Sequence, residues 1–271
     1  MNLPAILTKA QIVENKEIIP QIYLMKLYSP ELASRVIAGQ FFHIKVADRT
    51  DLLLRRPLSV FNYSKDNVSM LYEVVGKGTA VLAEKRPGIE LDILGPLGNG
   101  FSITPDVKQV ILVSGGIGVA PIFCWAKELV DKKRQGTDID IKVLIGAKNR
   151  YRVLCEEDFK GLGLVPEIAT DDGSAGHNGF VTDLLKSDHC LPSTIDHRPS
   201  TVVYACGPNA MLKETAKALS DHKINGYVSM DRWMGCGMGV CLGCVVKTTD
   251  GKYKRACKDG PVFRADEIEW I

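Results

Sequence analysis

Four cysteines near the end of the chain have the spacing of metal ligands. Cys236, Cys241, Cys244 and Cys257 follow the pattern C-x4-C-x2-C-x12-C, and the segment MGCGMGVCLGC at 234–244 also holds four glycines. Cysteine thiolates bind zinc or iron–sulfur clusters, and thiols can also pair as disulfides. A disulfide knot, a zinc site and an iron–sulfur centre are therefore the three interpretations to compare.

The spacing favours iron and sulfur. C-x4-C-x2-C with a more distant fourth cysteine is the plant-type [2Fe–2S] pattern. Structural zinc sites more often use two C-x2-C pairs, and only one is present; a disulfide knot is disfavoured in a reducing cytoplasm. The glycines let bare amides approach and donate to cluster sulfurs. Zinc remains the alternative, whereas a Rieske centre is disfavoured because no C-x-H pair with matching spacing is present.

Two motifs in the first third of the chain could bind phosphate. RRPLS at 55–59 offers arginine forks that bind phosphate oxygens in pairs. GKGT at 76–79 precedes an apolar helical run, and free amides at a helix start bind anions. The competing interpretations are a solvated basic turn and a plain strand-to-helix turn.

Three motifs in the middle of the chain are typical of a dinucleotide site. SGGIGVAP at 114–121 follows an apolar strand and resembles the glycine turn that holds a pyrophosphate at a helix start. TDDGSAG at 170–176 could bind ribose hydroxyls, and ACGPNAM at 205–211 follows another predicted strand. Acidic residues favour NAD over NADP, although three basic residues between 148 and 152 reduce that preference. Ordinary tight or surface turns are the alternatives.

The surrounding elements predict three domains. Residues 1–102 contain short β-branched and aromatic runs, which predict an antiparallel β-barrel with one short helix. Residues 103–225 alternate apolar strands with amphipathic helices, which predicts an α/β domain with a parallel sheet. Residues 226–271 are too few for a large core, so a metal centre would help this module to fold. The stretch 186–200 has no clear period and is predicted to be a surface loop.

Composition excludes several classes of partner. The 271 residues carry a net charge of +2, which gives no reason to expect nucleic acid or an anionic membrane. No run of 18 apolar residues predicts a membrane span, and the N-terminus lacks the features of a secretory signal, so we expect a cytoplasmic protein. No nucleophile motif stands out, and no histidine pairs with a carboxylate at helical spacing.

Taken together, the motifs resemble a known family. They are LRRPLSVFN, VVGKGT, GPLGNGF, GGIGVAP, ATDDGSAGHNGFVTDLL, YACGPNAML, RWMGCGMGVCLGCV and CKDGPVF. This combination is similar to the electron-transfer subunits of class 1B dihydroorotate dehydrogenases, which belong to the ferredoxin–NADP reductase superfamily. The resemblance covers nearly the whole chain, and the combination is specific although the single motifs are not.

The resemblance implies three cofactor sites and no catalytic acid or base. The residues implied for FAD are Arg56, Pro57, Leu58, Ser59, Gly76, Gly78 and Thr79. Those implied for NAD(H) are Gly115, Gly116, Gly118, Asp171, Cys206, Gly207 and Pro208. The four ligands implied for the [2Fe–2S] cluster are Cys236, Cys241, Cys244 and Cys257.

The resemblance also implies a partner. The chain is too short to hold an FMN barrel, so a separate FMN-containing subunit would oxidise dihydroorotate in pyrimidine biosynthesis. Electrons would pass singly to the cluster, then to FAD, and leave as hydride to NAD⁺, in a heterotetramer with two of each subunit. The alternatives are the small subunit of an NADH-dependent ferredoxin:NADP oxidoreductase or of a sulfide dehydrogenase, and a zinc-dependent module without enzymatic activity. Two features depart from the family: the short gap before Cys257, and a long 186–200 loop with Cys190.

Overall fold

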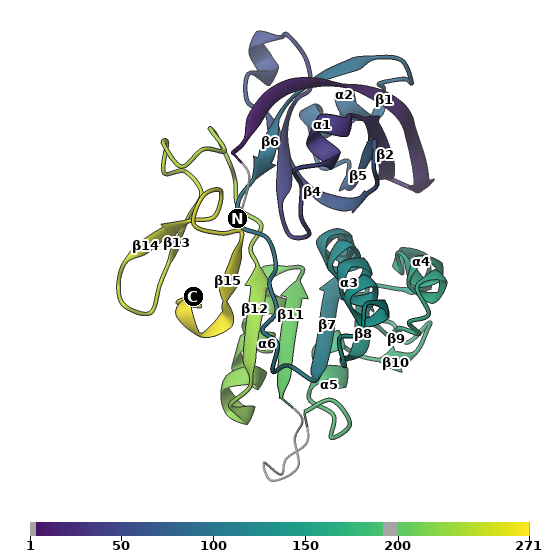
Figure 1. Ribbon diagram of the computed structural model, residues 1–271, viewed down its shortest axis with the longest axis vertical. Coiled ribbons are helices and arrows are strands. Elements are labelled where there is room, and N and C mark those ends of the chain that lie inside the picture. The colour runs from purple at the N-terminus through teal and green to yellow at the C-terminus, as the bar shows by residue number, and fades with distance from the viewer. Residues whose placement is uncertain (1–3, 192–199, 271) are drawn as a thin grey trace. The chain divides into compact units, whose positions relative to one another are not determined.

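The computed structural model describes residues 4–191 and 200–270 (Figure 1). The chain divides into two compact units, and the C-terminal zone contributes to both. The first unit comprises the residues up to Phe101 together with Asp231–Val246 and Lys254–Pro261; the second comprises Ser102–Met230, Lys247–Tyr253 and the residues from Val262. The three domain boundaries drawn from the sequence stay a prediction.

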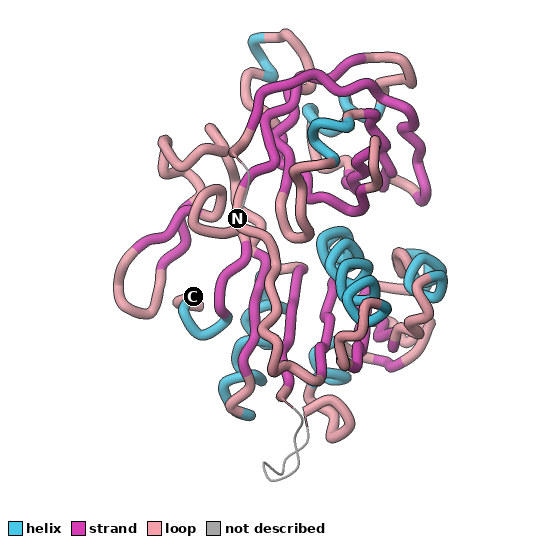
Figure 2. The backbone as a smooth tube through the Cα atoms, viewed as in Figure 1, coloured by secondary structure: helices cyan, strands magenta, loops and turns pink. Residues whose placement is uncertain are grey.

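A closed antiparallel barrel forms most of the first unit, as the sequence predicts. Its strand order is β1-β2-β5-β4-β3-β6, and Figure 2 shows the strands curving round a common core. Buried side chains such as Met25, Phe42 and Met70 fill the interior, and closure leaves no unpaired edge. The elements are β1 (Ile6–Ile19), β2 (Ile22–Tyr28), α1 (Pro30–Ala33), β3 (Phe41–Lys45), η1 (Thr50–Leu52), β4 (Arg56–Tyr63), β5 (Asn67–Glu73), α2 (Lys77–Ala83) and β6 (Glu90–Leu97).

Strand β1 closes the barrel, although its sequence only weakly indicates a strand. It pairs with β2 on one side and with β6 on the other. Its sequence, ILTKAQIVENKEII, is rich in Lys, Glu and Asn, which are poor strand formers, and only Ala10 and Ile12 are buried. Its conformation is therefore set by its two neighbours rather than by local preference.

A seven-stranded sheet in the order β10-β9-β8-β7-β11-β12-β15 forms the second unit. All its neighbouring strands are parallel except β12 and β15, which confirms the predicted α/β fold. The strands are β7 (Gln109–Gly115), β8 (Asp140–Ala147), β9 (Glu167–Thr170), β10 (His177–Asn178), β11 (Thr201–Cys206), β12 (Asn225–Ser229) and β15 (Val262–Arg264). The helices are η2 (Gly116–Gly118), α3 (Val119–Arg134), η3 (Arg150–Arg152), α4 (Glu156–Gly161), α5 (Val181–Leu185), α6 (Asn209–His222) and η4 (Ala265–Glu267).

The C-terminal zone contains a small hairpin and a strand of the large sheet. Strands β13 (Val245–Lys247) and β14 (Tyr253–Arg255) pair as a two-stranded sheet. Strand β15 pairs antiparallel with β12, and its Phe263 is buried. The sequence predicts neither element, because three-residue strands carry too little pattern. Within the described residues, no helix has both the length and the apolar character to cross a membrane.

Candidate functional site

The hairpin of β13 and β14 places two of the four C-terminal cysteines side by side. Cys244 immediately precedes β13, and Cys257 follows β14. The N–H of Ala256 donates to the carbonyl of Cys244 at 3.0 Å, which ties the two ends of the hairpin together. Both cysteines are buried, whereas Cys236 is half-buried and Cys241 is exposed. One pair of sulfurs is therefore inside the module and the other is at its surface.

Backbone amides surround the sulfur of Cys236. The N–H groups of Met238, Val240 and Cys241 each lie 3.4 Å from Cys236 Sγ. Desolvation raises the pKa of this thiol, but the three amides together outweigh it and lower the pKa to about 6. Because the thiolate is the form that binds metals, this loop favours the ligating state of its first cysteine.

The four sulfurs form two pairs rather than one tetrahedron. The thiol of Cys236 interacts with that of Cys241, and the thiol of Cys257 interacts with that of Cys244. In the described part of the chain, no three cysteine sulfurs all lie within 4.8 Å of one another. A zinc ion with Zn–S distances of about 2.3 Å would bring all four to about 3.8 Å from one another. Two pairs fit a two-iron centre, in which each iron takes two thiolates.

The thiol of Cys257 is held in its protonated form until a metal replaces the proton. Burial, followed by the hydrogen bond with Cys244, raises the pKa of Cys257 to about 12. A metal ion must therefore displace a proton to bind here, and this couples metal binding to the local fold.

An arginine connects the two cysteine segments. Arg255 Nε lies 2.8 Å from Asp259 Oδ2, and its Nη2 lies 2.9 Å from Asp259 Oδ1, so the ion pair is bidentate. Its Nη1 also donates to the carbonyl of Gly239 at 3.2 Å. The hairpin end that carries Cys257 is thus joined to the loop that carries Cys236 and is held in a fixed orientation.

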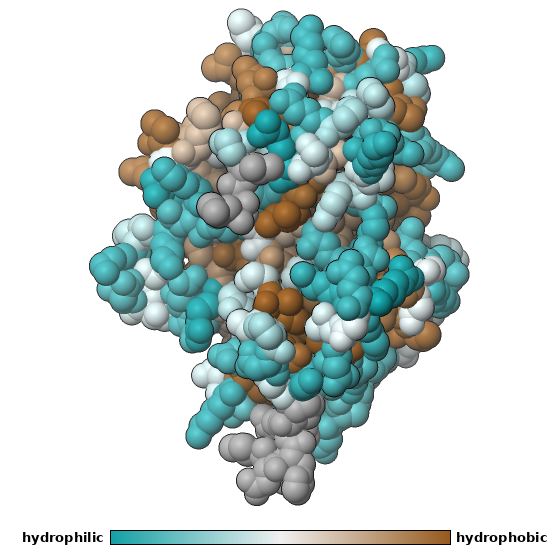
Figure 3. All heavy atoms as spheres, viewed as in Figure 1, coloured by the Kyte–Doolittle hydropathy of each residue, from teal (hydrophilic) through white to brown (hydrophobic). Residues whose placement is uncertain are grey.

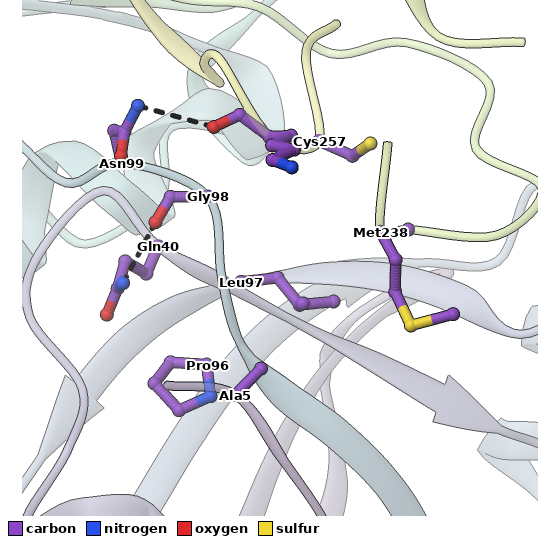
Figure 4. A pocket seen from close by; sticks show the side chains of 10 residues that line it. Ala5, Gln40, Pro96, Leu97, Gly98, Asn99, Met238 and Cys257 are labelled. Atoms are coloured by element: carbon purple, nitrogen blue, oxygen red, sulfur yellow. Dashed lines mark hydrogen bonds between the residues drawn. The ribbon is translucent and has the colours of Figure 1, made fainter. Parts of the chain in front are cut away.

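A pocket lies where the cysteine segments meet the end of the barrel (Figure 4). Gln40, Leu97 and Gly98 line it from the barrel side, and Met238 and Cys257 line it from the cysteine segments. Gln40 Nε2 donates to the carbonyl of Gly98 at 2.9 Å, which fixes the barrel side of the opening. Cys257 is thus a buried residue that lies at the wall of this pocket.

The two predicted phosphate-binding motifs come together in the barrel. A Cβ on Gly78 would lie 2.2 Å from Arg56 Nε, so the arginine side chain crosses directly over this glycine. The hydroxyl of Thr79 accepts from the N–H of Val75 at 3.0 Å and donates to the carbonyl of Gly76 at 3.1 Å. A cationic fork and a fixed helix start therefore occupy one small region, which suits a phosphate group.

The two arginines of RRPLS have different roles. Arg55 makes an ion pair with Asp92 at 2.8 Å and donates to the Asp92 carbonyl at 2.9 Å, so it braces strand β6. The second arginine starts strand β4, where Pro57 and Ser59 are half-buried and Leu58 is buried. Sequence reasoning treats the arginines as a pair, whereas only the second lies beside the glycine motif.

The predicted nucleotide turns pack against each other in the second unit. Strands β7 and β11 are parallel neighbours, with Ser114 beside Cys206, so both turns begin at the same edge of the sheet. A Cβ on Gly118 would lie 2.3 Å from the carbonyl oxygen of Cys206 and 2.7 Å from the nitrogen of Gly207. Gly116 has φ +53°, a left-handed conformation that favours glycine. These glycines are required by the backbone itself.

The polar residues beyond β9, for which the sequence predicts ribose binding, lie beside a basic residue beyond β8. Asp171 is exposed, whereas the carboxylate of the next residue accepts from the hydroxyl of Ser174 at 2.6 Å. The N–H of Arg150 donates to the same hydroxyl at 2.8 Å, and its guanidinium pairs with Glu156. The basic charge that could attract a phosphate is therefore already partly neutralised.

Two family models match the chain. Residues 112–217 match the oxidoreductase NAD-binding domain, and residues 231–269 match the iron–sulfur cluster binding domain of dihydroorotate dehydrogenase B. The chain is 37% identical over 256 residues to the dihydroorotate dehydrogenase B (NAD(+)) electron transfer subunit of Desulforamulus reducens, covering 93% of this chain and 94% of the relative. The same subunit of Bacillus caldolyticus is 39% identical over 254 residues, covering 90% and 93%.

This chain belongs to the family of dihydroorotate dehydrogenase B electron transfer subunits. The resemblance read from the motifs is confirmed, as are an iron–sulfur module and a NAD-binding oxidoreductase domain. The matched iron–sulfur domain includes all four cysteines, and the matched NAD-binding domain includes the glycine turn and the Cys-Gly-Pro turn.

Solved structures place the family in its fold class. A structure of an NADH-dependent reduced ferredoxin-NADP oxidoreductase, studied for flavin-based electron bifurcation, has a TM-score of 0.83 and 30% identity, covering 96% of this chain and 90% of its own. A ferredoxin NADP⁺ reductase from Neisseria gonorrhoeae with bound FAD and NADP has a TM-score of 0.66 and 20% identity, covering 80% and 91%. The reductase fold predicted for the family is thereby confirmed.

His43 is a buried residue that the sequence patterns do not single out. Its side chain is 0% exposed in strand β3, and neither ring nitrogen has a hydrogen-bond partner among the described residues. Burial, followed by the nearby charge of Arg55, lowers its pKa to about 4, so the ring is neutral. A Cβ on Gly237 would lie 2.5 Å from its Nδ1, so the ring directly contacts the loop at 233–244, called the cysteine loop below. No motif or period marks a lone histidine in an apolar strand.

The predicted loop at 186–200 is described only in part, because residues 192–199 lie outside the described residues. Cys190 is 1% exposed. Nearby, His189 Nε2 lies 3.0 Å from Glu167 Oε2, and His189 Nδ1 lies 2.9 Å from Ser187 Oγ. This cysteine is thus a buried residue beside a surface ion pair.

Proposed function

We propose that this chain is the electron-transfer subunit of a NAD-dependent dihydroorotate dehydrogenase in pyrimidine biosynthesis. It accepts electrons from an FMN-containing catalytic subunit and delivers them to NAD⁺ by way of a [2Fe–2S] cluster and FAD. The observation that carries the proposal is the arrangement of the four cysteines in two pairs within the matched iron–sulfur module. When bound, the cluster supplies one-electron transfer and the flavin links it to two-electron hydride chemistry.

The protein's own residues bind and orient the groups. Arg56 and the helix start at Gly78 bind the flavin pyrophosphate, while Leu58 and Ser59 contact the flavin ring. Their closeness in the barrel supports this assignment, since a fork and free amides both suit phosphate. The amides around Cys236 Sγ hold that ligand as a thiolate. No side chain is assigned a proton-transfer role.

The nucleotide binds across the two packed turns of the second unit. The amides at Gly116 and Gly118 bind the pyrophosphate, and the Cys206–Pro208 turn lies beside the nicotinamide. Asp171 accepts from a ribose hydroxyl, and its negative charge disfavours a 2′-phosphate. Arg150, which could oppose this preference, is paired with Glu156. We therefore propose NAD(H) rather than NADP(H).

The catalytic subunit binds the outer face of the cysteine loop. Four large apolar side chains of this loop are exposed, and Figure 3 shows hydrophobic residues gathered over the loop that Figure 1 draws in yellow-green. They are Trp233, Met238, Val240 and Leu242, with exposed fractions of 93%, 52%, 77% and 59%. Exposed apolar groups of this kind are typical of protein interfaces, and electron transfer requires close approach. The proposed assembly is a heterotetramer with two copies of each subunit.

A second function has one observation in its favour. The chain is 30% identical over nearly its full length to the NADH-dependent reduced ferredoxin-NADP oxidoreductase structure. In that case the same cofactors would serve a different large subunit. The higher identity of 37–39% to the dihydroorotate dehydrogenase subunits favours the first function.

The test is co-purification with native partners under anaerobic conditions, followed by cofactor analysis and assays of NAD⁺ reduction. We expect iron and FAD in the preparation, an FMN-containing partner, and NAD⁺ reduction that depends on dihydroorotate. An intact complex that reduces NAD⁺ with another donor but not with dihydroorotate would overturn the pathway assignment. Zinc in place of iron would overturn the electron-transfer role itself.

A further inference from the structure

One buried polar side chain of the barrel has no explanation in the fold itself. His43 is completely buried, yet both of its ring nitrogens lack hydrogen-bond partners within the described residues. Leaving two polar atoms of a neutral ring unpaired in a core is unfavourable, so a core position would normally hold an apolar residue. The cost indicates a requirement that is separate from barrel stability.

The position of His43 connects two of the sites. In strand β3 it pairs with Pro57 of the RPLS motif on one side and with Leu94 on the other. Its Nδ1 faces Gly237, where a Cβ would lie only 2.5 Å away. Gly237 directly follows the first cysteine of the cluster motif and has φ +71°. The backbones of Arg55 and Cys236 also approach the ring, neither with a hydrogen bond of good geometry.

We propose that His43 is a positioning residue for the iron–sulfur site. Its ring holds the Cys236–Gly237 backbone against strand β3, and its Nδ1–H donates to the carbonyl of Cys236 when the cysteines bind metal. The first ligand is thereby fixed from the same barrel strand that supports the proposed flavin motif. Polar groups that orient metal ligands are commonly worth 10-fold to 100-fold in metal affinity, which is the size of effect expected here.

The inference rests on the proposed iron–sulfur function, and three variants of the full-length chain separate the two. His43→Leu keeps the volume of the ring but removes both nitrogens. His43→Asn keeps an N–H close to the position of Nδ1. Tyr72→Phe is the matched control, because it removes a buried hydroxyl of the same barrel that donates to Asn15 at 2.9 Å, away from the cysteine loop.

Each protein is reconstituted anaerobically with iron and sulfide, and the cluster is then titrated with a chelator. Thermal unfolding of the metal-free chain is measured in parallel. We expect His43→Leu to bind iron about tenfold less tightly and to show an altered electron paramagnetic resonance spectrum of the reduced cluster. Its metal-free form unfolds at the same temperature as the native chain or higher, because an unpaired polar ring is replaced by an apolar group. His43→Asn restores most of the iron affinity.

The control is expected to behave in the opposite way. Tyr72→Phe lowers the unfolding temperature of the metal-free chain and leaves iron affinity unchanged, because it removes a satisfied hydrogen bond far from the ligands. If His43→Leu keeps native iron affinity and spectrum, or lowers iron affinity only together with metal-free stability, the positioning role is wrong. If the native chain itself takes up no iron, the failure belongs to the proposed function instead.

Discussion

Two glycine-rich loops of this protein use glycine for opposite physical reasons. In the nucleotide turns, a Cβ on Gly118 would lie 2.3 Å from the carbonyl oxygen of Cys206, so backbone packs on backbone with no space between. In the cysteine loop, a Cβ on Gly235 or Gly243 would meet only the sulfur of Cys241, at 3.3 and 3.6 Å. Gly118 is thus closed in by backbone, whereas Gly235 and Gly243 are open beside the outer sulfur pair; the other two glycines of the cysteine loop, Gly237 and Gly239, meet the side chains of His43 and Lys258.

The difference indicates where each loop obtains its order. The nucleotide turns are held by the strands of a seven-stranded sheet and need no ligand to keep their shape. The cysteine loop is held by the hairpin, the Arg255–Asp259 pair and the contact with His43, and its apolar side chains face outward. Under the proposed function, its remaining order comes from the metal centre and the partner, since structural metal binding is coupled to folding.

The largest effect is expected from removing a buried cysteine ligand. Cys244→Ser should abolish the iron–sulfur cluster and NAD⁺ reduction by dihydroorotate, because one iron loses a thiolate. Amide hydrogen exchange should become faster in 234–244, while NAD⁺ affinity stays native because the nucleotide turns are independently packed. Cys155→Ser, outside the matched iron–sulfur domain, should keep its iron. Loss of NAD⁺ binding in Cys244→Ser would contradict the independence of the two loops.

A side chain added between the two packed nucleotide turns should damage those turns and leave the cysteine loop unaffected. Gly118→Ala inserts a methyl group against backbone atoms that cannot move separately, so we expect a loss of about 1–3 kcal/mol in the stability of the second unit. NAD⁺ affinity should fall as well, while iron content stays native. Calorimetry together with iron analysis measures both effects. A Gly118→Ala protein with native NAD⁺ affinity would show that the two nucleotide turns can move apart without losing NAD⁺ binding.

The sequence predicts those features that have a strong local pattern. The barrel and the α/β sheet are predictable because alternating strands, apolar runs and amphipathic helices each have a period. The cysteine ligands are predictable because their spacing is itself the signal. Strand β1 is harder to predict, because only its first half alternates buried and exposed residues and its second half is rich in Lys, Glu and Asn; its conformation is set by its pairing with β2 and β6.

Contacts between distant segments account for what the sequence leaves out. Nothing in RRPLS indicates that Arg55 pairs with Asp92 while the next arginine crosses Gly78. Nothing in the FFHIK strand indicates that its histidine faces the cysteine loop some two hundred residues later. These contacts join segments that are far apart in the sequence, and no local pattern encodes them.

A third glycine tests an intermediate case, in which a side chain rather than the backbone occupies the space. Gly78→Ala would meet Arg56 Nε at 2.2 Å, but a long side chain can move away. We therefore expect a change in unfolding free energy within about 0.5 kcal/mol, together with weaker FAD binding, because the displaced guanidinium no longer reaches the phosphate. Flavin retention on dialysis measures the effect. Unchanged flavin retention would show that Arg56 does not belong to the proposed flavin site.

The smallest effect on the metal-free chain is expected at the open loop. A Cβ on Gly243 meets only Cys241 Sγ at 3.6 Å, and its backbone is not left-handed, so Gly243→Ala causes no clash. Removing a glycine also reduces the entropy of the unfolded chain, so the metal-free protein should be unchanged or stabilised by up to about 1 kcal/mol. Iron affinity should nevertheless fall, because the methyl group occupies space beside the outer sulfur pair. Native iron affinity in Gly243→Ala would mean that the open space beside Cys241 serves chain flexibility alone. The contrast between the two loops would then rest on the Gly118 contact only.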